Sequence, residues 1–201
     1  MSELLCITNR KLCAGDFLER LEQVVSAPNK VSSIVLREKD LPVNEYAELL
    51  LAVMDICRRH GVALTVHSHA ELALQYGLGL HLPLAVLREM EASRRLKLSA
   101  LPALGVSCHS VADAQEAEGL GCTYVTAGHI WATDCKAGLP GRGTEFLRQV
   151  CQAVKVPVYA IGGITPPRMA EVVACGATGA CIMSSLMKCY SPAELLQEFD
   201  I

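Results

Sequence analysis

The segment from Gly128 to Gly143 holds the side chains best suited to chemistry in this sequence. His129 directly follows the apolar run 124–127, and Lys136 and Arg142 follow on a glycine-rich stretch. The apolar run has the composition of a buried strand, so we expect His129 at the carboxyl end of that strand. An imidazole with an ordinary pKa of about 6.5 can take up and return a proton near neutral pH. We therefore predict that His129 is a catalytic acid/base.

A second pair of short motifs is typical of an anion site. Gly162 and Gly163 follow one later apolar run, and Met183 and Ser184 follow the next. Glycine lets backbone N–H groups approach an anion, and the loops after strands seven and eight of a parallel barrel commonly bind phosphate. We predict that these four residues bind a phosphate group. The alternative is that the glycines only make a tight turn before a helix.

Two cations come at the end of another predicted strand. Arg37 and Lys39 lie two residues apart, so both side chains point to the same side if the strand continues. Their charges suit a second anionic group, either a carboxylate or a diphosphate. The alternative is ordinary surface charge on a loop. Lys136 and Arg142 either add to this positive rim or are solvated, and Ser107 ends a further predicted strand that faces the same site.

The elements that would position these residues alternate along the whole chain. Helix starts are predicted at Asp16, Ser110 and Ser191, each with an acidic residue three positions later. Alternating short strands and helices predict a single-domain (β/α)8 TIM barrel of the α/β class over residues 1–201, with a doubly wound open sheet as the competitor. The eight predicted strands cover residues 4–8, 33–37, 63–67, 79–82, 103–107, 123–128, 158–161 and 179–183.

Five of the six histidines fall at or just beyond predicted strand ends. They are His67, His69, His81, His109 and His129. We interpret this clustering as a polar, functional mouth of the barrel. A metal site is not favoured, because His67 and His69 share a strand face without an acidic residue or a third histidine nearby.

Composition narrows the class of protein. The net charge of −3 and the pI of about 6.1 argue against nucleic acid as a partner. The amino terminus does not look like a signal peptide, and no apolar segment approaches the length needed to span a membrane. The ten cysteines are expected to be reduced, small core residues. We expect a cytoplasmic protein with a small-molecule substrate and no membrane partner, and a homodimer is compatible with the sequence.

Several of these motifs together resemble the thiamine phosphate synthase superfamily. The residues that carry the resemblance are 36–40, 105–110, 160–164 and 183–185. The segment 128–143, with His129, Lys136 and Arg142, is similar to the TenI branch of that superfamily in particular. The resemblance covers nearly the whole chain and implies the barrel fold independently.

The TenI resemblance implies a thiazole tautomerase, an isomerase that aromatises a carboxythiazole phosphate by a proton shift without a cofactor or a metal. It implies His129 as the acid/base and the phosphate at Gly163, Met183 and Ser184. It also implies that the thiazole lies near residues 133–135, which are Thr133, Asp134 and Cys135. Arg37 and Lys39 would then face the substrate carboxylate.

Departures from the synthase pattern support the same expectation. The synthases carry an Asn-Asp pair after strand three and an acidic residue past strand four, and these acids hold the magnesium of the pyrimidine diphosphate. Here His67 and Ser68 stand at the first place, and no acid closely follows His81 at the second. We therefore expect no synthase activity. A magnesium-dependent synthase and a non-catalytic regulator that binds thiazole phosphate are the alternatives.

Overall fold

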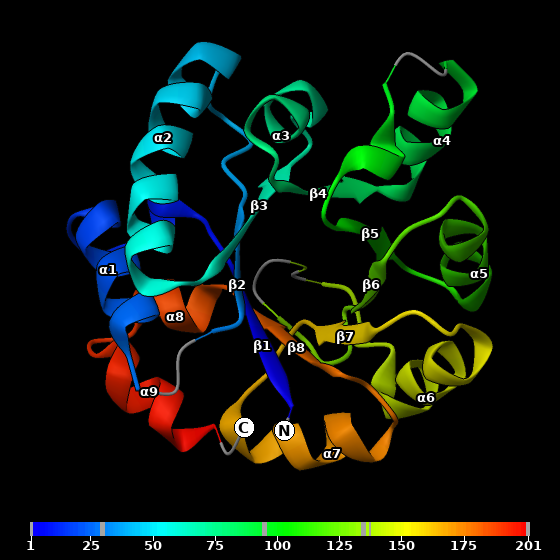
Figure 1. The fold of residues 1–201 in the computed structure, drawn as a ribbon. Helices are drawn as coiled ribbons and strands as arrows, with labels where there is room; N and C mark the ends of the chain where they lie inside the picture. The colour runs from blue at the N-terminus through cyan, green and yellow to red at the C-terminus, as the bar shows by residue number, and fades with distance from the viewer. Residues whose placement is uncertain (1, 29–30, 94–95, 134–135, 137, 200–201) are drawn as a thin grey trace.

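Eight parallel strands form a closed barrel in the computed structural model, which describes residues 2–28, 31–93, 96–133, 136 and 138–199 (Figure 1). The strands follow one another around the barrel in chain order, and β1 pairs with β8 to close it. This closure excludes the open sheet and confirms the predicted (β/α)8 barrel. The strands are β1 (Glu3–Ile7), β2 (Ser33–Leu36), β3 (Ala63–His67), β4 (Gly79–Pro83), β5 (Leu104–Cys108), β6 (Tyr124–Gly128), β7 (Val158–Ile161) and β8 (Gly179–Ile182).

Helices lie around the outside of the ring of strands (Figure 1). The α-helices are α1 (Phe17–Ser26), α2 (Val43–His60), α3 (Ala70–Tyr76), α4 (Leu84–Ser93), α5 (Val111–Gly119), α6 (Gly143–Ala153), α7 (Met169–Ala174), α8 (Ser184–Lys188) and α9 (Pro192–Glu198). Short 3-10 helices are η1 (Arg10–Leu12), η2 (Leu98–Ala100) and η4 (Pro166–Arg168).

The predicted helix starts are confirmed by their capping hydrogen bonds. The Asp16 carboxylate accepts a hydrogen bond from the backbone N–H of Glu19 at 2.9 Å. The Ser110 hydroxyl does the same for Asp113 at 3.0 Å, and Ser191 caps α9 in the same way. Each side chain satisfies one of the backbone donors that a helix start leaves unpaired.

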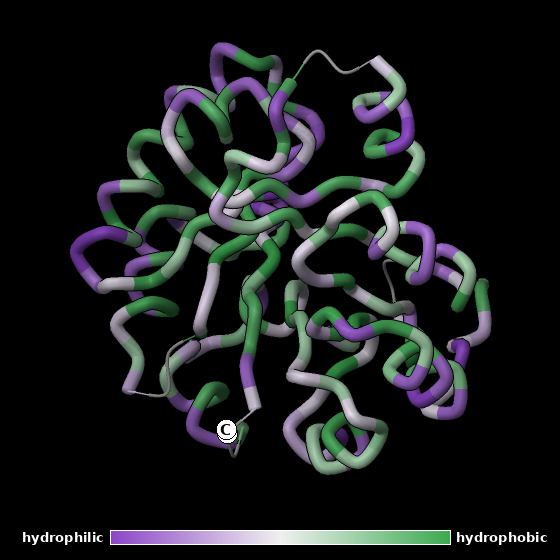
Figure 2. Tube along the Cα trace, turned by 45° about the vertical axis from the view of Figure 1, so that its right-hand side comes forward, coloured by the Kyte–Doolittle hydropathy of each residue, from purple (hydrophilic) through white to green (hydrophobic). Residues whose placement is uncertain are grey.

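Apolar residues pack in two layers, one outside the barrel and one inside it. Figure 2 shows the helices alternating between hydrophobic and hydrophilic residues, as expected of helices that pack one face on the strands. Inside the barrel a smaller cluster is formed by Leu5, Ile7, Val35, Tyr124, Tyr159 and Cys181. The barrel interior is therefore a packed core, and the open space lies at the ends of the strands.

One polar side chain, His81, is buried inside the barrel next to that cluster. It is only 2% exposed, and its ring nitrogens lie 3.0 Å from the Tyr124 hydroxyl and 2.9 Å from the Ser107 hydroxyl. Gly105 makes the space, because a Cβ there would lie 2.1 Å from the Tyr124 ring and 2.5 Å from His81 Nδ1. The glycine thus allows a hydrogen-bonded histidine to sit below the mouth of the barrel.

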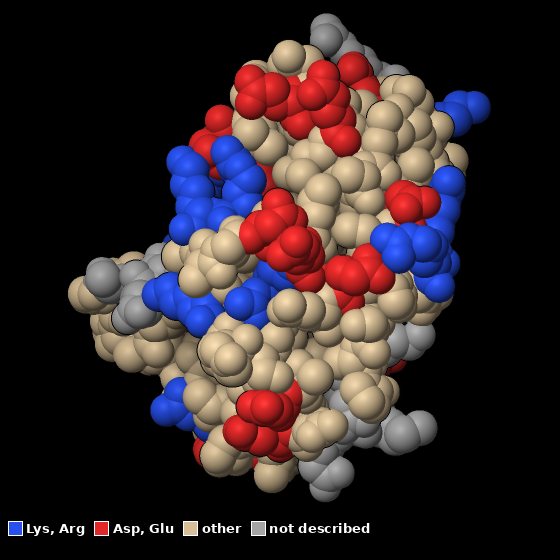
Figure 3. Space-filling model, turned by 90° about the vertical axis from the view of Figure 1, so that its left-hand side faces the viewer, with Lys and Arg blue, Asp and Glu red and all other residues tan. Residues whose placement is uncertain are grey.

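The face over α1 and α2 carries acidic and basic side chains interspersed with each other (Figure 3). Arg59 of α2, for example, pairs with Glu22 of α1 at 2.8 Å. The visible described side chains on this face form no continuous basic stripe.

The described part of the chain contains nine cysteines. All nine are free thiols, and six of them are buried. Burial raises the pKa of the Cys57 and Cys108 thiols to about 12, so they behave as apolar core residues. Among the described helices, none combines the length and the hydropathy that crossing a membrane requires.

Candidate active site

A cavity of about 680 Å³ opens at the carboxyl ends of the strands and is lined by residues from every strand end. Its size suits a small-molecule ligand. Every predicted site residue that the structure describes lines this cavity: Arg37, Lys39, Ser107, His129, Thr133, Lys136, Gly162, Gly163, Met183 and Ser184. Asp134 and Cys135 lie outside the described residues. The barrel therefore brings together residues that are up to 147 positions apart, between Arg37 and Ser184.

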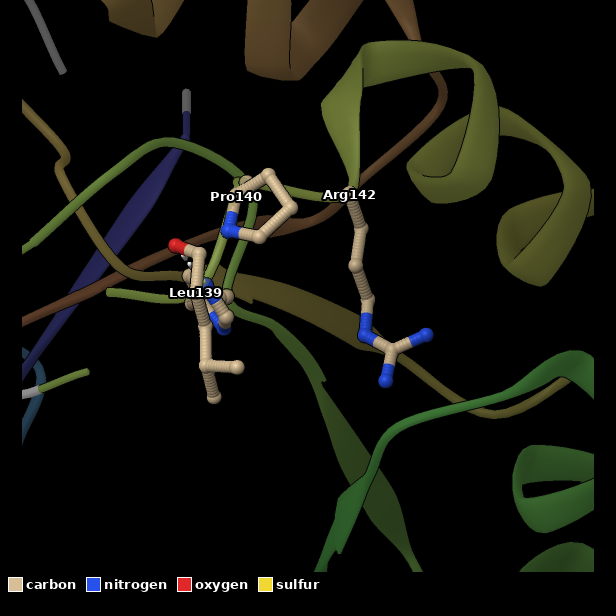
Figure 4. A pocket seen from close by; sticks show the side chains of 5 residues that line it. Leu139, Pro140 and Arg142 are labelled. Carbon is tan, nitrogen blue, oxygen red and sulfur yellow. Dashed lines mark hydrogen bonds between the residues drawn. The ribbon is translucent and has the colours of Figure 1, made fainter. Parts of the chain in front are cut away.

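His129 directly follows β6, as predicted, and lies on the wall of the cavity. Its Nε2 lies 3.3 Å from the carbonyl oxygen of Leu139. His129 also lines a smaller hollow of about 380 Å³ with Leu139, Pro140, Gly141 and Arg142. Figure 4 shows Leu139 and Pro140 on one side of this hollow and Arg142 beside them at the start of α6.

Arg142 does not join the positive rim that the sequence allowed. Its guanidinium lies over the Phe146 ring, 5.3 Å from the ring centroid, and it is absent from the described lining of the larger cavity. The backbone N–H of Arg142 donates to the carbonyl of His129 at 3.0 Å. This hydrogen bond therefore joins the end of the segment after β6 to its beginning.

The glycine pair after β7 is required by the backbone that packs against it. The N–H groups of Ile130 and Trp131 donate to the carbonyls of Ile161 and Gly162, so the chain after β6 continues along the end of β7. Gly162 has φ +97°, and a Cβ there would lie 2.4 Å from the Cβ of His129. Gly163 has φ +67° and is equally crowded. The turn alone accounts for both glycines, and their phosphate role stays a prediction.

Two cations missed by the sequence reasoning also line the cavity, Arg168 and Lys188. The Arg168 guanidinium donates to the Gly163 carbonyl and lies 4.9 Å from the centre of the Trp131 ring. It therefore fixes the rim between the segments after β6 and β7. Lys188 lies in α8, four residues after Ser184, on the same side of that helix. The i, i+4 spacing would have revealed it only if α8 had been predicted.

Arg37 and Lys39 both line the cavity, as their spacing predicted. The Arg37 guanidinium, together with burial and then Lys136, lowers the pKa of the Lys39 ammonium. Like charges held this close favour the arrival of a negatively charged ligand.

Histidines form part of the cavity floor, where His67 lies beside His81 with ring centroids 5.9 Å apart. Burial, followed by the nearby positive and imidazole groups, lowers the pKa of His67 to about 3. Burial and Arg37 lower the pKa of His81 to about 4. Both rings are therefore neutral at pH 7.

One member of the predicted histidine cluster lies elsewhere. The cavity includes His67, His81, His109 and His129, but not His69. His69 precedes α3 and packs against Tyr46, with ring centroids 4.1 Å apart. The chain turns at Ser68, which has a positive φ of 70°, and this turn carries His69 away from the mouth.

This fold and this site define a (β/α)8 barrel protein with a cationic pocket at the carboxyl ends of its strands, where barrel enzymes place their active sites. The chain belongs to the family described as "Thiamine monophosphate synthase", which matches residues 4–186.

Relatives named thiamine-phosphate synthase match most of the chain. The "Thiamine-phosphate synthase" of Moorella thermoacetica is 37% identical over 78% of this chain and 74% of its own length. That of Syntrophomonas wolfei is 32% identical over 92% of this chain and 88% of its own length. The chain spans only 35% of another relative, the "Thiamine biosynthesis bifunctional protein ThiM/ThiE" of Symbiobacterium thermophilum, at 37% identity over 86% of this chain.

Solved structures agree on the fold. The "Thiamine phosphate pyrophosphorylase" of Pyrococcus furiosus superposes with a TM-score of 0.81 at 26% identity, over 98% of this chain and 93% of that one. A "3-Hexulose-6-Phosphate Synthase" has a TM-score of 0.70 at 17% identity, which shows a shared fold alone.

These similarities overturn the predicted thiazole tautomerase and the expected lack of synthase activity. Relatives at 32–37% identity are named thiamine-phosphate synthase. The prediction of an isomerase depended on one segment around His129 and on a few missing acids. The family membership holds, but the TenI-specific activity does not follow from it.

The described residues do not fit the magnesium ion that the synthase pattern implies. Magnesium prefers oxygen ligands, commonly carboxylates. Neither Asp nor Glu is among the described residues that line the cavity. Throughout the described ranges, no group of three His, Cys, Asp or Glu side chains is arranged to hold a metal ion.

Proposed function

We propose that this protein is a thiamine-phosphate synthase, a transferase that joins a pyrimidine diphosphate to a thiazole phosphate. The proposal is supported by the synthase-named relatives, which match most of the chain. The observation that carries it is one cavity with two groups of residues suited to anions. Arg37 and Lys39 follow β2, and Gly163 and Ser184 follow β7 and β8. Two anionic substrates can therefore be held side by side.

The coupling needs two substrates in contact and one good leaving group. The pyrimidine's exocyclic carbon bonds to the thiazole nitrogen as its bond to the diphosphate oxygen breaks. The electron pair of that bond leaves with inorganic pyrophosphate, and the thiazole ring gains the positive charge. Cations that hold the diphosphate stabilise the charge that develops on it.

We assign the diphosphate to the side of Arg37 and Lys39, and the thiazole phosphate to Gly162, Gly163, Met183 and Ser184. Lys136 and Thr133 lie on the cavity wall and would contact the substrates, and Ser107 is held by its hydrogen bond to His81. The coupling step forms one bond and breaks another without transferring a proton. His129 is therefore assigned to substrate contact, and the acid/base role predicted for it is not needed.

Steady-state kinetics of Arg37→Gln test this assignment. We expect the KM for the pyrimidine diphosphate to rise about tenfold, since one charge-assisted contact is lost. The KM for the thiazole phosphate should stay within about twofold of the wild-type value. Lys155→Gln, an exposed lysine remote from the cavity, is the matched control and should change neither KM. An equal rise in both KM values, or no change in either, would contradict the assignment.

A further inference from the structure

Basic and acidic residues alternate along the segment after β2, and the basic side chains reach the cavity whereas the acidic ones bind partners outside it. Arg37 and Lys39 line the cavity, whereas the Glu38 residue is only 3% exposed and its side chain is hydrogen-bonded elsewhere. Glu38 accepts hydrogen bonds from the Thr8 hydroxyl at 2.6 Å and from the Arg10 backbone N–H at 3.0 Å. Its second oxygen also pairs with the Arg10 guanidinium at 3.2 Å. Glu38 is therefore not available as a ligand in the cavity.

Asp40 is held in the same way on the outer side. Arg10 donates two hydrogen bonds to its carboxylate, at 2.7 and 2.8 Å, and Lys11 pairs with it at 2.9 Å. These two cations hold the pKa of Asp40 well below its usual range. Both acids next to Arg37 and Lys39 in the sequence are thus neutralised away from the site, and the two pocket cations keep their charge for a ligand.

The synthase pattern has an Asn-Asp pair after strand three, and this chain has His67 and Ser68 there, so this position provides no carboxylate either. His67 Nδ1 lies 2.8 Å from the Ser68 hydroxyl, and its ring stacks beside His81. A neutral imidazole is a poor magnesium ligand, because this ion prefers oxygen. The described cavity lining thus lacks carboxylates but includes the cations Arg37, Lys39 and Lys136.

We infer that this pocket neutralises a diphosphate through Arg37, Lys39 and Lys136, and does so without a divalent metal ion. This inference rests on the proposed synthase function, which supplies the diphosphate. A cationic pocket with its neighbouring carboxylates already paired can bind a polyanion directly. A magnesium-dependent pocket would instead need acidic side chains directed at the metal, and the described lining has none.

Binding of inorganic pyrophosphate to the whole protein tests the inference without any turnover. Calorimetric titrations are made once in EDTA and once in excess magnesium chloride. We expect binding in EDTA to be at least as tight as in magnesium, because free magnesium competes for pyrophosphate. Lys39→Gln should weaken binding in EDTA about tenfold, since one charged contact is removed. Lys155→Gln is the matched control and should bind as the wild type does.

Binding that appears only with magnesium, or that magnesium tightens tenfold or more, would overturn the inference. So would undetectable binding in both buffers, or wild-type affinity in Lys39→Gln. Asp134→Asn is titrated as well, because a metal held through Asp134 would make the wild type respond to magnesium and the variant not. That outcome would also overturn the inference.

Synthase turnover of the same samples separates the inference from the proposed function. Turnover together with magnesium-dependent pyrophosphate binding overturns the inference and leaves the function standing. Pyrophosphate binding in EDTA without turnover overturns the function and supports the metal-independent anion site.

Discussion

Gly162 shows how one missing side chain shapes the active-site wall. Its positive φ and its close approach to His129 both disfavour any larger residue. In the sequence, only its place in the predicted phosphate site distinguishes this glycine. The structure adds a stronger reason, because the chain after β6 could not pass the end of β7 otherwise.

Gly162→Ala should lower the free energy of unfolding by on the order of 3 kcal/mol, from backbone strain plus overlap with His129. Gly61→Ala is the control, because Gly61 also has a positive φ of 63° but no described atom within 4 Å of an added Cβ. Its cost should be only about 1 kcal/mol, from strain alone. Urea denaturation measures both, and equal costs would show that the contact with His129 does not matter.

His81 makes stability depend on pH. Its pKa falls from an ordinary 6.5 to about 4 on folding, mainly because of burial and then because of Arg37. Between these values the unfolded chain binds a proton that the folded chain does not. The contribution of His81 to the free energy of unfolding is therefore fully present above pH 6.5 and is lost as the pH falls towards 4.

At pH 5 the loss due to His81 should be on the order of 2 kcal/mol relative to pH 7. His81→Gln removes the titration and should show a smaller drop between the two pH values. Denaturation of both proteins at pH 7 and pH 5 checks this. Identical drops in the wild type and the variant would rule out the role of His81.

At the level of elements, one buried hydroxyl connects α2 to two strand ends of the site. The Tyr46 hydroxyl donates to the Leu36 carbonyl at 2.6 Å and accepts from the His67 N–H at 3.3 Å. Arg37 directly follows Leu36, so this tyrosine helps to hold the start of the cationic segment as well as the histidine floor.

Tyr46→Phe should destabilise the protein by on the order of 2 kcal/mol, because it leaves buried backbone groups unpaired. Tyr190 is 99% exposed, so Tyr190→Phe should change stability by less than about 0.5 kcal/mol. Thermal or urea unfolding compares the two. A Tyr46→Phe protein as stable as the wild type would mean that water or a backbone shift replaces the hydroxyl.

The elements themselves were largely predictable. Each of the eight strands begins and ends within one residue of its predicted limits, because β-rich apolar runs bounded by turn residues are a strong local signal. The helix α8 was missed, since its five residues are too few to show a periodic pattern. Because α8 was not predicted, Lys188 was not recognised as a residue of the cavity.

At the level of the whole molecule, the barrel explains why the site was predictable at all. Parallel strands place their carboxyl ends at one edge, so a list of strand-end residues is already a list of neighbours. The directions of individual side chains were not predictable in this way. Nothing local indicated that Glu38 would turn to Thr8 and Arg10, that Arg142 would stack on Phe146, or that His69 would leave the mouth.

The reaction was the least predictable part. A histidine at a strand end and a few missing acids favoured a proton shift, whereas the relatives that match most of the chain favour the proposed coupling reaction. Local chemistry shows what a residue can do, and several reactions can use the same cationic pocket.

Product analysis tests the proposed synthase activity. The purified protein is given a pyrimidine diphosphate and a thiazole phosphate together, and thiamine phosphate and inorganic pyrophosphate are measured by mass spectrometry and a pyrophosphate assay. We expect both products to form in equal amounts and neither to form when one substrate is omitted. Absence of thiamine phosphate from a folded protein that binds both substrates would contradict it.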